Sequence, residues 1–340
     1  MTKREREILR RLQSHEPRIR SAFLRAILLI TGAATISEIE AAISSGQLDQ
    51  VIQAMGLAPA ALALLVESVR ETYLDGGLME VDNLNRRAVR VYFDIRNPRA
   101  ELWLRQNSSQ LITAILSDQR EAVRIVLQAG TILGNNPRTT ALDIVGRINK
   151  ATGRRSGGIV GLTSQQASYV TNARRQLLSG DPAQMTAYFD RKLRDRRFDG
   201  IVRRAIAAEK PVSVADVQRI TGRYADRLLK LRGDMIGRTE SLQAFSAARN
   251  EAVEQMIESG AVQARNVTKK WSSARDGRTR DTHAAMHNQQ QPFRQPFRSP
   301  SGALLMYPGD RSLGAGAGEI IACRCIATPK IDYLAEGLGG

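Results

Sequence analysis

Cysteines, aromatic residues and long apolar runs are all scarce in this chain, and two of these scarcities exclude a class of protein. Only two cysteines occur in 340 residues, Cys323 and Cys325. Two cysteines cannot form the disulfide framework of a small secreted domain, and they favour a reducing compartment. The longest uncharged apolar stretches, near 26–37 and 54–66, are interrupted by glycine or proline and are shorter than the roughly 20 residues that cross a bilayer. We therefore expect a soluble protein without a membrane partner.

The N-terminus lacks the features of a signal peptide. Its first 17 residues, MTKREREILRRLQSHEP, alternate charges along a helical pattern, whereas a signal peptide has an uninterrupted apolar core. We expect no export by that route.

Acidic residues are fewer than basic ones. The 50 Lys and Arg against 34 Asp and Glu give a formal charge of +16, which favours a polyanionic partner such as nucleic acid or an acidic protein surface. The alternative is that scattered arginines only keep the protein soluble. The run 191–204 is the densest basic cluster, so we predict either phosphate contacts or a solvated helix face for Arg191, Lys192, Arg194, Arg196, Arg197, Arg203 and Arg204.

Helix signals dominate the first three quarters of the chain. Capping-box patterns occur at Ser37 with Glu40, at Thr163 with Gln166 and at Ser213 with Asp216. After the third pattern, apolar residues recur every three or four positions, which predicts one buried face of a long helix, at Val217, Ile220, Tyr224, Leu228, Leu231 and Met235. Its other faces are basic. A solvated basic side is favoured over a DNA-reading helix for Arg219, Arg223, Arg227, Lys230 and Arg232.

The fold class follows from these patterns. We predict a mainly α protein, with elongated helical N-terminal and middle regions and a small α+β C-terminal module. The predicted domains are 1–155, 156–260 and 261–340, with the Gly and Arg rich 153–158 as a linker. Residues 88–95 alternate enough for a short strand or an extended connector.

The C-terminal module is expected to consist of a short helix, loops and two or three strands. Prolines in 289–302 predict a loop there, and 303–310 reads as a strand closed by a type II turn at Pro308-Gly309. A Gly-rich run then leads into a second strand.

The module concentrates the metal-ligating residue types of the chain. His283 and His287 stand four apart, so they share a face of a helix, and Cys323 and Cys325 point to one side of a strand. Together they could close a tetrahedral zinc site, although paired cysteines in zinc sites usually have a wider spacing. The alternatives are hydrogen-bonded histidines with buried packing cysteines, or a cysteine nucleophile assisted by histidine.

Charges of both signs precede the first of these histidines. Asp276, Arg278, Arg280 and Asp281 could form a network that ties loops together without catalysis. We predict that Trp271 packs this network against the preceding helix.

The order of features resembles a known family. GRTES at 237–241, Trp271, DGRTRDTH at 276–283, a loop phenylalanine, LLMYPGD at 304–310 and EIIACRC at 319–325 are similar, in sequence and order, to the phage head morphogenesis family of Mu F-like minor head proteins. Ala322 stands where the family often has Asn. The motif positions that the resemblance implies as structural are Arg238, Thr239, Glu240, Trp271, Asp276, Arg278 and Arg280.

The resemblance implies a non-enzymatic minor component of a tailed-phage or prophage head. Its expected partners are the portal protein, major capsid or scaffolding proteins, and packaged double-stranded DNA. Its expected location is the virion, with assembly in the bacterial cytoplasm. Two alternatives stay open: a hydrolase-like or toxin-like enzyme using the His/Cys cluster, and a simple nucleic-acid-binding module.

Overall fold

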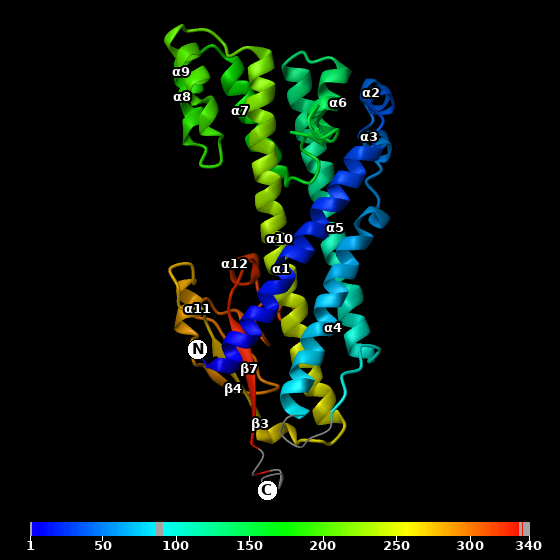
Figure 1. Ribbon diagram of the computed structural model, residues 1–340, viewed down its shortest axis with the longest axis vertical. Coiled ribbons are helices and arrows are strands. Elements are labelled where there is room, and N and C mark those ends of the chain that lie inside the picture. Colours follow the sequence, from blue (N-terminus) through cyan, green and yellow to red (C-terminus); the bar gives the residue numbers. More distant parts are fainter. Residues whose placement is uncertain (1, 86–90, 333–334, 336–340) are drawn as a thin grey trace. The chain divides into compact units, whose positions relative to one another are not determined.

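The computed structural model describes residues 2–85, 91–332 and 335 and divides into two compact units. Unit 1 comprises residues 1–22, 65–109 and 234–340, and unit 2 comprises 23–64 and 110–233. Helices α1, α5 and α10 contribute residues to both (Figure 1). The boundaries of the three predicted domains, 1–155, 156–260 and 261–340, differ from those of the two units, and the three domains stay a prediction.

Helices account for most of the described chain, so the predicted mainly α fold is confirmed. The α-helices are α1 (Lys3–Ala33), α2 (Ile36–Ser44), α3 (Leu48–Ala54), α4 (Ala63–Asn85), α5 (Pro98–Ile132), α6 (Pro137–Val145), α7 (Ser164–Leu178), α8 (Pro182–Thr186), α9 (Asp199–Ala207), α10 (Val214–Glu258), α11 (Asp281–Ala285) and α12 (Ala317–Ile320). Short 3-10 helices are η1 (Pro59–Leu62), η2 (Ala187–Asp190), η3 (Arg196–Phe198) and η4 (Ala264–Asn266).

The strands form three small antiparallel sheets. They are β1 (Arg147–Ile148), β2 (Arg155–Ser156), β3 (Val267–Ser272), β4 (Gln290–Pro292), β5 (Phe297–Arg298), β6 (Leu304–Leu305) and β7 (Ile326–Ile331). The orders are β1-β2, β4-β3-β7 and β5-β6. The predicted α+β C-terminal module is therefore present, with β3 at the centre of its larger sheet.

Helix α10 begins where its capping pattern predicts. Ser213 Oγ accepts a hydrogen bond from Asp216 N (3.2 Å) and donates one to Asp216 Oδ2 (2.8 Å). The apolar stripe is buried from Val217 to Leu228, but Leu231 is 41% exposed. The next residue, Arg232, is buried instead, so the prediction that Arg232 lies on the solvated basic face was wrong.

The burial of Arg232 has specific causes inside unit 2. Its guanidinium donates to Gly161 O (3.1 Å) and to Asp118 Oδ2 (2.9 Å), and it lies 5.8 Å from the centre of the Phe23 ring. A buried arginine needs such partners. The helical period alone cannot reveal them, because they come from other segments.

Two further capping predictions have opposite outcomes. Thr163 and Gln166 form the reciprocal capping box at the start of α7, as predicted. The prediction for Ser37 with Glu40 was wrong, because the N-cap of α2 is Thr35, two residues earlier, and its side chain makes no capping hydrogen bond. Glu40 pairs with Arg138 at 2.8 Å instead.

The structure differs from three predictions that concern connecting segments. The expected linker 153–158 contains β2, which pairs with β1, so part of it is a hairpin. Residues 91–94 form no strand, and 88–90 lie outside the described residues. The predicted loop 289–302 contains β4 and β5. β4 is an edge strand, where Pro292 is tolerated because it need not donate to a second neighbour.

The turn at Pro308-Gly309 is confirmed. Gly309 has φ +89°, and Asp310 N donates to Tyr307 O at 3.1 Å. A positive φ at the third residue is what a type II turn requires. The turn follows β6, which is shorter than the strand predicted over 303–310.

The C-terminal sheets pack on the second half of α10 within unit 1. One buried cluster joins Leu242 and Phe245 of α10 to Trp271, Phe297 and Leu305 of the strands. A second joins Val253 and Met256 to Val267, Phe293 and Ile331. These clusters fix β3 and β7 against the helix and so position the segments that surround them.

Among the described residues, no single helix has the length and apolar composition of a membrane span. Two sharply bent helix pairs, 3–33 with 36–44 and 48–54 with 59–82, meet those criteria only as pairs.

Candidate metal centre

Trp271 packs beside His283, Cys323 and Cys325, the residues of the candidate metal centre. It occupies β3, its side chain is fully buried, and its ring lies edge-on to His283 (5.3 Å between centroids) and to Phe297 (5.2 Å). Such T-shaped contacts suit the ring quadrupole. Trp271 thus packs with Leu242 and Phe245 of the preceding helix α10, while its ring neighbours are His283 and Phe297 rather than the charged residues of the predicted network. It also limits the positions open to the His283 ring.

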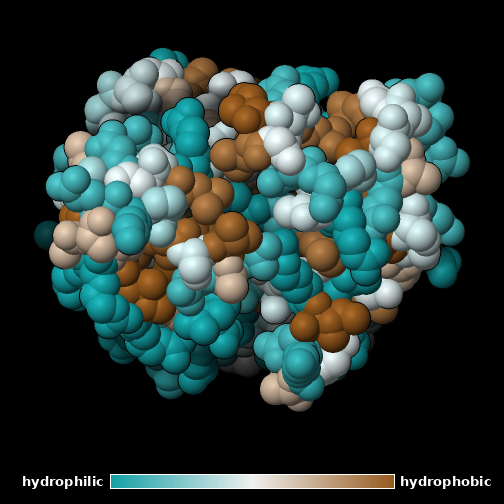
Figure 2. Space-filling view, turned by 90° about the horizontal axis from the view of Figure 1, so that it is seen from above, coloured by the Kyte–Doolittle hydropathy of each residue, from teal (hydrophilic) through white to brown (hydrophobic). Residues whose placement is uncertain are grey.

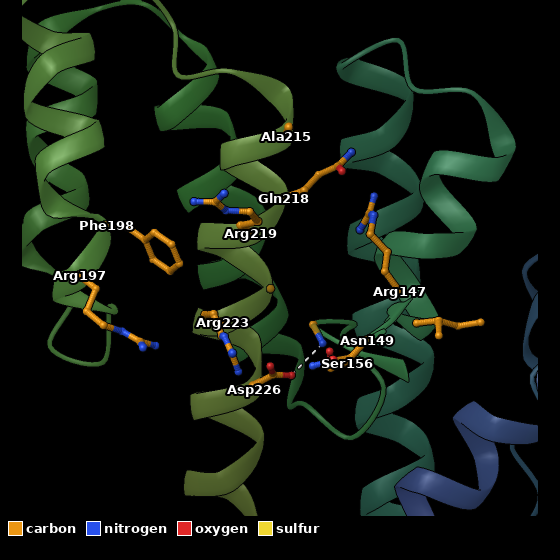
Figure 3. A pocket seen from close by; sticks show the side chains of 13 residues that line it. Arg147, Asn149, Ser156, Arg197, Phe198, Ala215, Gln218, Arg219, Arg223 and Asp226 are labelled. Atoms are coloured by element: carbon orange, nitrogen blue, oxygen red, sulfur yellow. Dashed lines mark hydrogen bonds between the residues drawn. The ribbon is translucent and has the colours of Figure 1, made fainter. Parts of the chain in front are cut away.

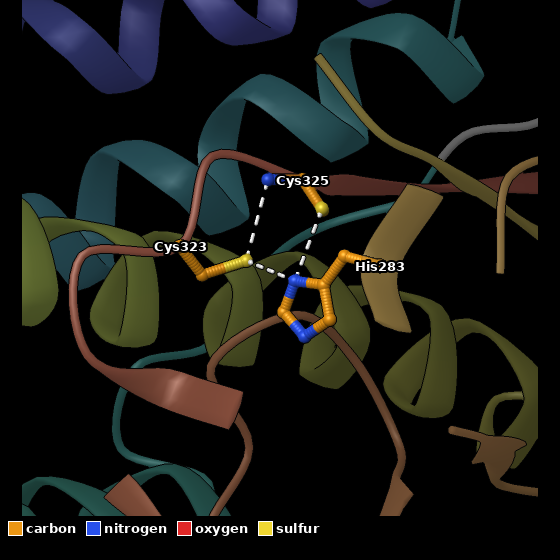
Figure 4. Close-up of side chains that lie close together, drawn as sticks. All are labelled: His283, Cys323 and Cys325. Atoms are coloured by element: carbon orange, nitrogen blue, oxygen red, sulfur yellow. Dashed lines mark hydrogen bonds between the residues drawn. The ribbon is translucent and has the colours of Figure 1, made fainter. Parts of the chain in front are cut away.

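The imidazole of His283 faces two sulfur atoms (Figure 4). Its Nδ1 lies 3.3 Å from Cys323 Sγ and 3.5 Å from Cys325 Sγ. The Cys325 backbone N–H also donates to Cys323 Sγ at 3.4 Å. His283 lies on α11 as predicted, but the cysteines precede β7 rather than lying on it. The three side chains are buried together.

The other edge of the imidazole contacts a carboxylate. His283 Nε2 lies 2.7 Å from Glu319 Oε2, on α12. Glu319 Oε1 accepts hydrogen bonds from Ser301 Oγ (2.7 Å) and Ser299 Oγ (3.2 Å). The carboxylate is therefore held on both sides. Because Nε2 is engaged by Glu319, the ring orientation that presents Nδ1 to the sulfurs is fixed.

These contacts set the protonation of the cluster. A hydrogen bond from the Cys325 thiol holds the pKa of Cys323 well below its usual value, against burial and with help from His283. The same hydrogen bond, together with burial, raises the pKa of Cys325. Burial opposes a charged imidazole, but the contacts with Cys323 and Glu319 outweigh it and raise the pKa of His283. The arrangement favours a thiolate at Cys323 beside an imidazolium.

His287 does not join the cluster. It lies beyond the end of the five-residue helix α11, and its Nδ1 lies 3.2 Å from both the backbone N and the Oγ of Ser273. The shared helix face was wrong for this pair because the helix ends at Ala285, before His287 is reached. The structure therefore brings together three of the four predicted ligands.

The donor set fits a soft divalent metal such as zinc in part. The ligand atoms of His283, Cys323 and Cys325 lie within 4.8 Å of one another. Imidazole and thiolate ligands suit zinc, and the Glu319–His283 contact is the outer-shell support that zinc-bound histidines usually have. Within the described ranges, no fourth His, Cys, Asp or Glu belongs to this group. A tetrahedral ion would need another ligand, such as a water.

Of the predicted charge network of Asp276, Arg278, Arg280 and Asp281, only part is present among the described residues. Arg324 makes two hydrogen bonds of 2.7 Å to the Asp276 carboxylate. Arg280 donates to the carbonyl of Ile321, and the Arg278 backbone N–H donates to Asp276 Oδ1 at 3.1 Å. These bonds tie 276–280 to the segment that carries the cysteines.

The GRTES segment of α10 also contacts the segment that carries the two cysteines. Thr239 Oγ1 accepts a hydrogen bond from Ala322 N at 3.0 Å. Glu240 is buried, accepts a hydrogen bond from Asn107 Nδ2 (3.2 Å) and pairs with Arg311 (3.4 Å). Arg238 pairs with Glu16 at 3.4 Å. Burial raises the pKa of Glu240, despite Arg311 and Asn107.

Two residues near the centre were not predicted from the sequence as site residues. Glu319 is the one carboxylate in the Gly-rich segment GAGAGEIIACRC, and that isolation was a usable signal. Lys269 is buried, donates from Nζ to Met306 O (2.7 Å) and lies over the Phe297 ring at 5.2 Å. Burial lowers its pKa to about 8. Alternation on β3 would have predicted an inward position for it, but not its partners.

The basic run 191–204 lies in unit 2, and three of its seven basic residues pair with aspartates of the same run. Arg194 binds the Asp199 carboxylate twice at 3.1 Å, Arg197 pairs with Asp195 at 2.6 Å, and Arg203 lies 3.8 Å from Asp199. Arg191 donates to Ala187 O at 3.1 Å. The remaining basic side chains of the run, Lys192, Arg196 and Arg204, are exposed.

Comparison with known families identifies the segment that contains the centre. Residues 213–328, roughly a third of the chain, match the family model described as Phage Mu protein F like protein. This segment resembles the Phage Mu F like family. The match confirms the resemblance inferred from the motifs, and the matched range includes GRTES, Trp271, His283 and both cysteines. No curated protein and no solved structure gave a match. The family match supports a structural role in phage head morphogenesis.

Ala322 gives the first testable prediction. It has φ +52°, in the left-handed region that Asn and Gly tolerate better than Ala or a β-branched residue. The Asn that the resemblance implies at this position would suit that conformation. We expect Ala322→Asn to raise the free energy of unfolding by about 0.5–1 kcal/mol, and Ala322→Val to lower it by about 1–2 kcal/mol. Chemical denaturation checks both, and a Val variant as stable as the wild type would contradict the backbone assignment.

Proposed function

We propose that the protein is a non-enzymatic minor component of a phage head that acts at the portal. The observation that carries this proposal is the Phage Mu F like match over 213–328. The geometry agrees with it: the His/Cys/Glu centre is buried and connects α10, α11, α12 and β7. Such a centre braces loops into a fixed surface, which is what a docking protein needs.

Burial of the reactive groups supports the non-enzymatic part of the proposal. Cys323 is 2% exposed and His283 is 1% exposed. A thiol nucleophile must reach its substrate, and reactive cysteines are usually partly exposed. The Cys323–His283 contact alone would suit a thiol hydrolase, but its enclosure by Trp271 and Glu319 favours a structural role.

The proposed partners are the portal protein, with major capsid or scaffolding proteins, and packaged double-stranded DNA. The family match supports other head components in general and a place in the virion. Assembly in the host bacterial cytoplasm is part of the proposal. The charge of +16 is compatible with a position beside DNA.

The portal assignment predicts a selective association. We expect the purified protein to cosediment with heads that contain the portal, and not with heads assembled without it. A Trp271→Ala variant, which removes the wall of the buried centre, should bind portal-containing heads at least about tenfold more weakly, because loss of the ring disorganises the loops. An Arg265→Ala variant is the matched control, because Arg265 is exposed and lies outside the cluster and its network. Equal binding to both kinds of head would contradict the portal role.

We also propose that the centre holds one zinc ion through His283, Cys323 and Cys325. Zinc would supply a cross-link between α11 and the segment before β7. Elemental analysis should find about one zinc per chain in the wild type, none in the Cys323→Ser plus Cys325→Ser variant, and an unchanged amount in His287→Gln. Zinc-free wild-type protein with a native circular dichroism spectrum would end this proposal and leave the head assignment intact.

A further inference from the structure

A second site lies in unit 2, whereas the metal-ligating residues belong to unit 1. An open cleft of about 710 Å³ is lined by the β1–β2 hairpin, by η3 and by the first turns of α10. Four arginines line it, namely Arg147, Arg197, Arg219 and Arg223, with Asp226 as the one acidic residue of the lining. Figure 3 shows Arg219 and Arg223 on α10, with Arg147 to one side of the helix and Arg197 to the other. We call this hollow the arginine cleft.

The base of the arginine cleft is held tightly. Gly157 N donates to Asp226 Oδ1 at 2.7 Å. A Cβ on Gly157 would lie 2.7 Å from the Gly222 Cα, so glycine is needed where the hairpin crosses α10. Burial raises the pKa of Asp226, against the Gly157 hydrogen bond and Arg223. The hairpin and the helix therefore form one fixed surface.

The η3 wall is fixed to the same helix. Arg227 of α10 donates to the carbonyl of Arg194 at 2.6 Å and lies 3.5 Å from the Asp195 carboxylate. Phe198 on this wall lies against Arg219, with the guanidinium carbon 5.6 Å from the ring centre. The stacking orients a planar cation toward the cleft.

Two of the four arginines, Arg219 and Arg223, remain available to a ligand, whereas Arg147 pairs with Asp143 (2.9 Å) and Arg197 with Asp195 (2.6 Å). Arg219 has only a 3.4 Å ion pair with Asp216, and its side chain is 62% exposed. Arg223 is exposed and makes no hydrogen bond or ion pair with the residues that the structure describes. Arg219 and Arg223 stand four apart on α10, so they are neighbours on one helix face. A guanidinium fork binds phosphate through two parallel hydrogen bonds.

The surrounding sequence adds long-range attraction for a polyanion. Residues 147–232 contain 19 Lys and Arg against 7 Asp and Glu, which gives +12 of the total +16. On the face shown in Figure 2, hydrophobic residues form several separate groups among hydrophilic ones. The observations thus favour a charged ligand at the cleft over an apolar partner.

We propose that the arginine cleft binds the phosphodiester backbone of nucleic acid, through Arg147, Arg197, Arg219 and Arg223. Phe198 and the amides of Gln218 and Asn149 line the same hollow, and an aromatic ring beside a basic groove is typical of nucleic-acid binding. This inference deepens the proposed contact with DNA. It places that contact at the cleft, which includes Arg197 of the run 191–204 but none of the other basic residues of that run.

The test measures binding of the full chain to fluorescent double-stranded DNA by anisotropy over 50–200 mM salt. We expect Arg219→Gln plus Arg223→Gln to weaken binding about tenfold and to reduce the slope of log K against log salt by about 1.8, because two phosphate contacts are lost. Arg203→Gln plus Arg204→Gln on α9 is the matched control, since it removes the same charge outside the cleft and should change affinity less than about threefold. Equal losses in both variants would overturn the cleft assignment.

Two further arms complete the experiment. Single-stranded DNA of the same length shows whether one strand or a duplex supplies the backbone, and the cleft variant should lose affinity for whichever binds more tightly. Competition by poly-glutamate as effective as that by DNA of equal charge would show a site for acidic peptides, and would overturn the nucleic-acid assignment. Cosedimentation of the cleft variant with portal-containing heads is expected to be unchanged, so failure here is distinct from failure of the head assignment.

Discussion

The C-terminal module depends on one imidazole ring whose two nitrogens have different partners. His283 Nε2 contacts Glu319, and Nδ1 faces Cys323 and Cys325. Three short segments are joined at this point, because the ring lies on α11, the carboxylate on α12, and the sulfurs before β7. Small sheets of this length cannot supply a large apolar core. A buried polar network in which each member has partners can specify the arrangement instead.

Helix α10 serves both proposed sites. Its second half carries Thr239 and Glu240, which hold the cysteine segment and the loop of Arg311. Its first half carries Arg219 and Arg223 of the arginine cleft. The Phage Mu F like match begins at residue 213, at the cap of this helix. We infer that the helix is the common element of a protein that contacts both other head components and nucleic acid.

The sequence predicted the helical fold, the caps at Thr163 and Ser213, the Pro308-Gly309 turn and three of the four clustered ligands. These features are local, or they depend on a residue type that is scarce in the chain. The sequence-based prediction failed where contacts with distant segments determine burial. Arg232 is buried because it binds Asp118 and Gly161. The prediction for His287 failed because α11 is short. A spacing of four residues places two side chains on one face only if the helix continues through both. The cleft arginines come from separate segments, so no single pattern contained them.

Local opening of residues 319–326 tests the central claim most directly. Amide hydrogen exchange reports the free energy of such opening segment by segment. Replacing His283 by Gln should speed exchange at Ala322 and Cys325 by about a hundredfold or more, since a loss near 3 kcal/mol is expected for a buried charged network. Replacing His287 by Gln should leave these amides unchanged. Equal protection in both variants would contradict the view that the His283 ring holds the module together.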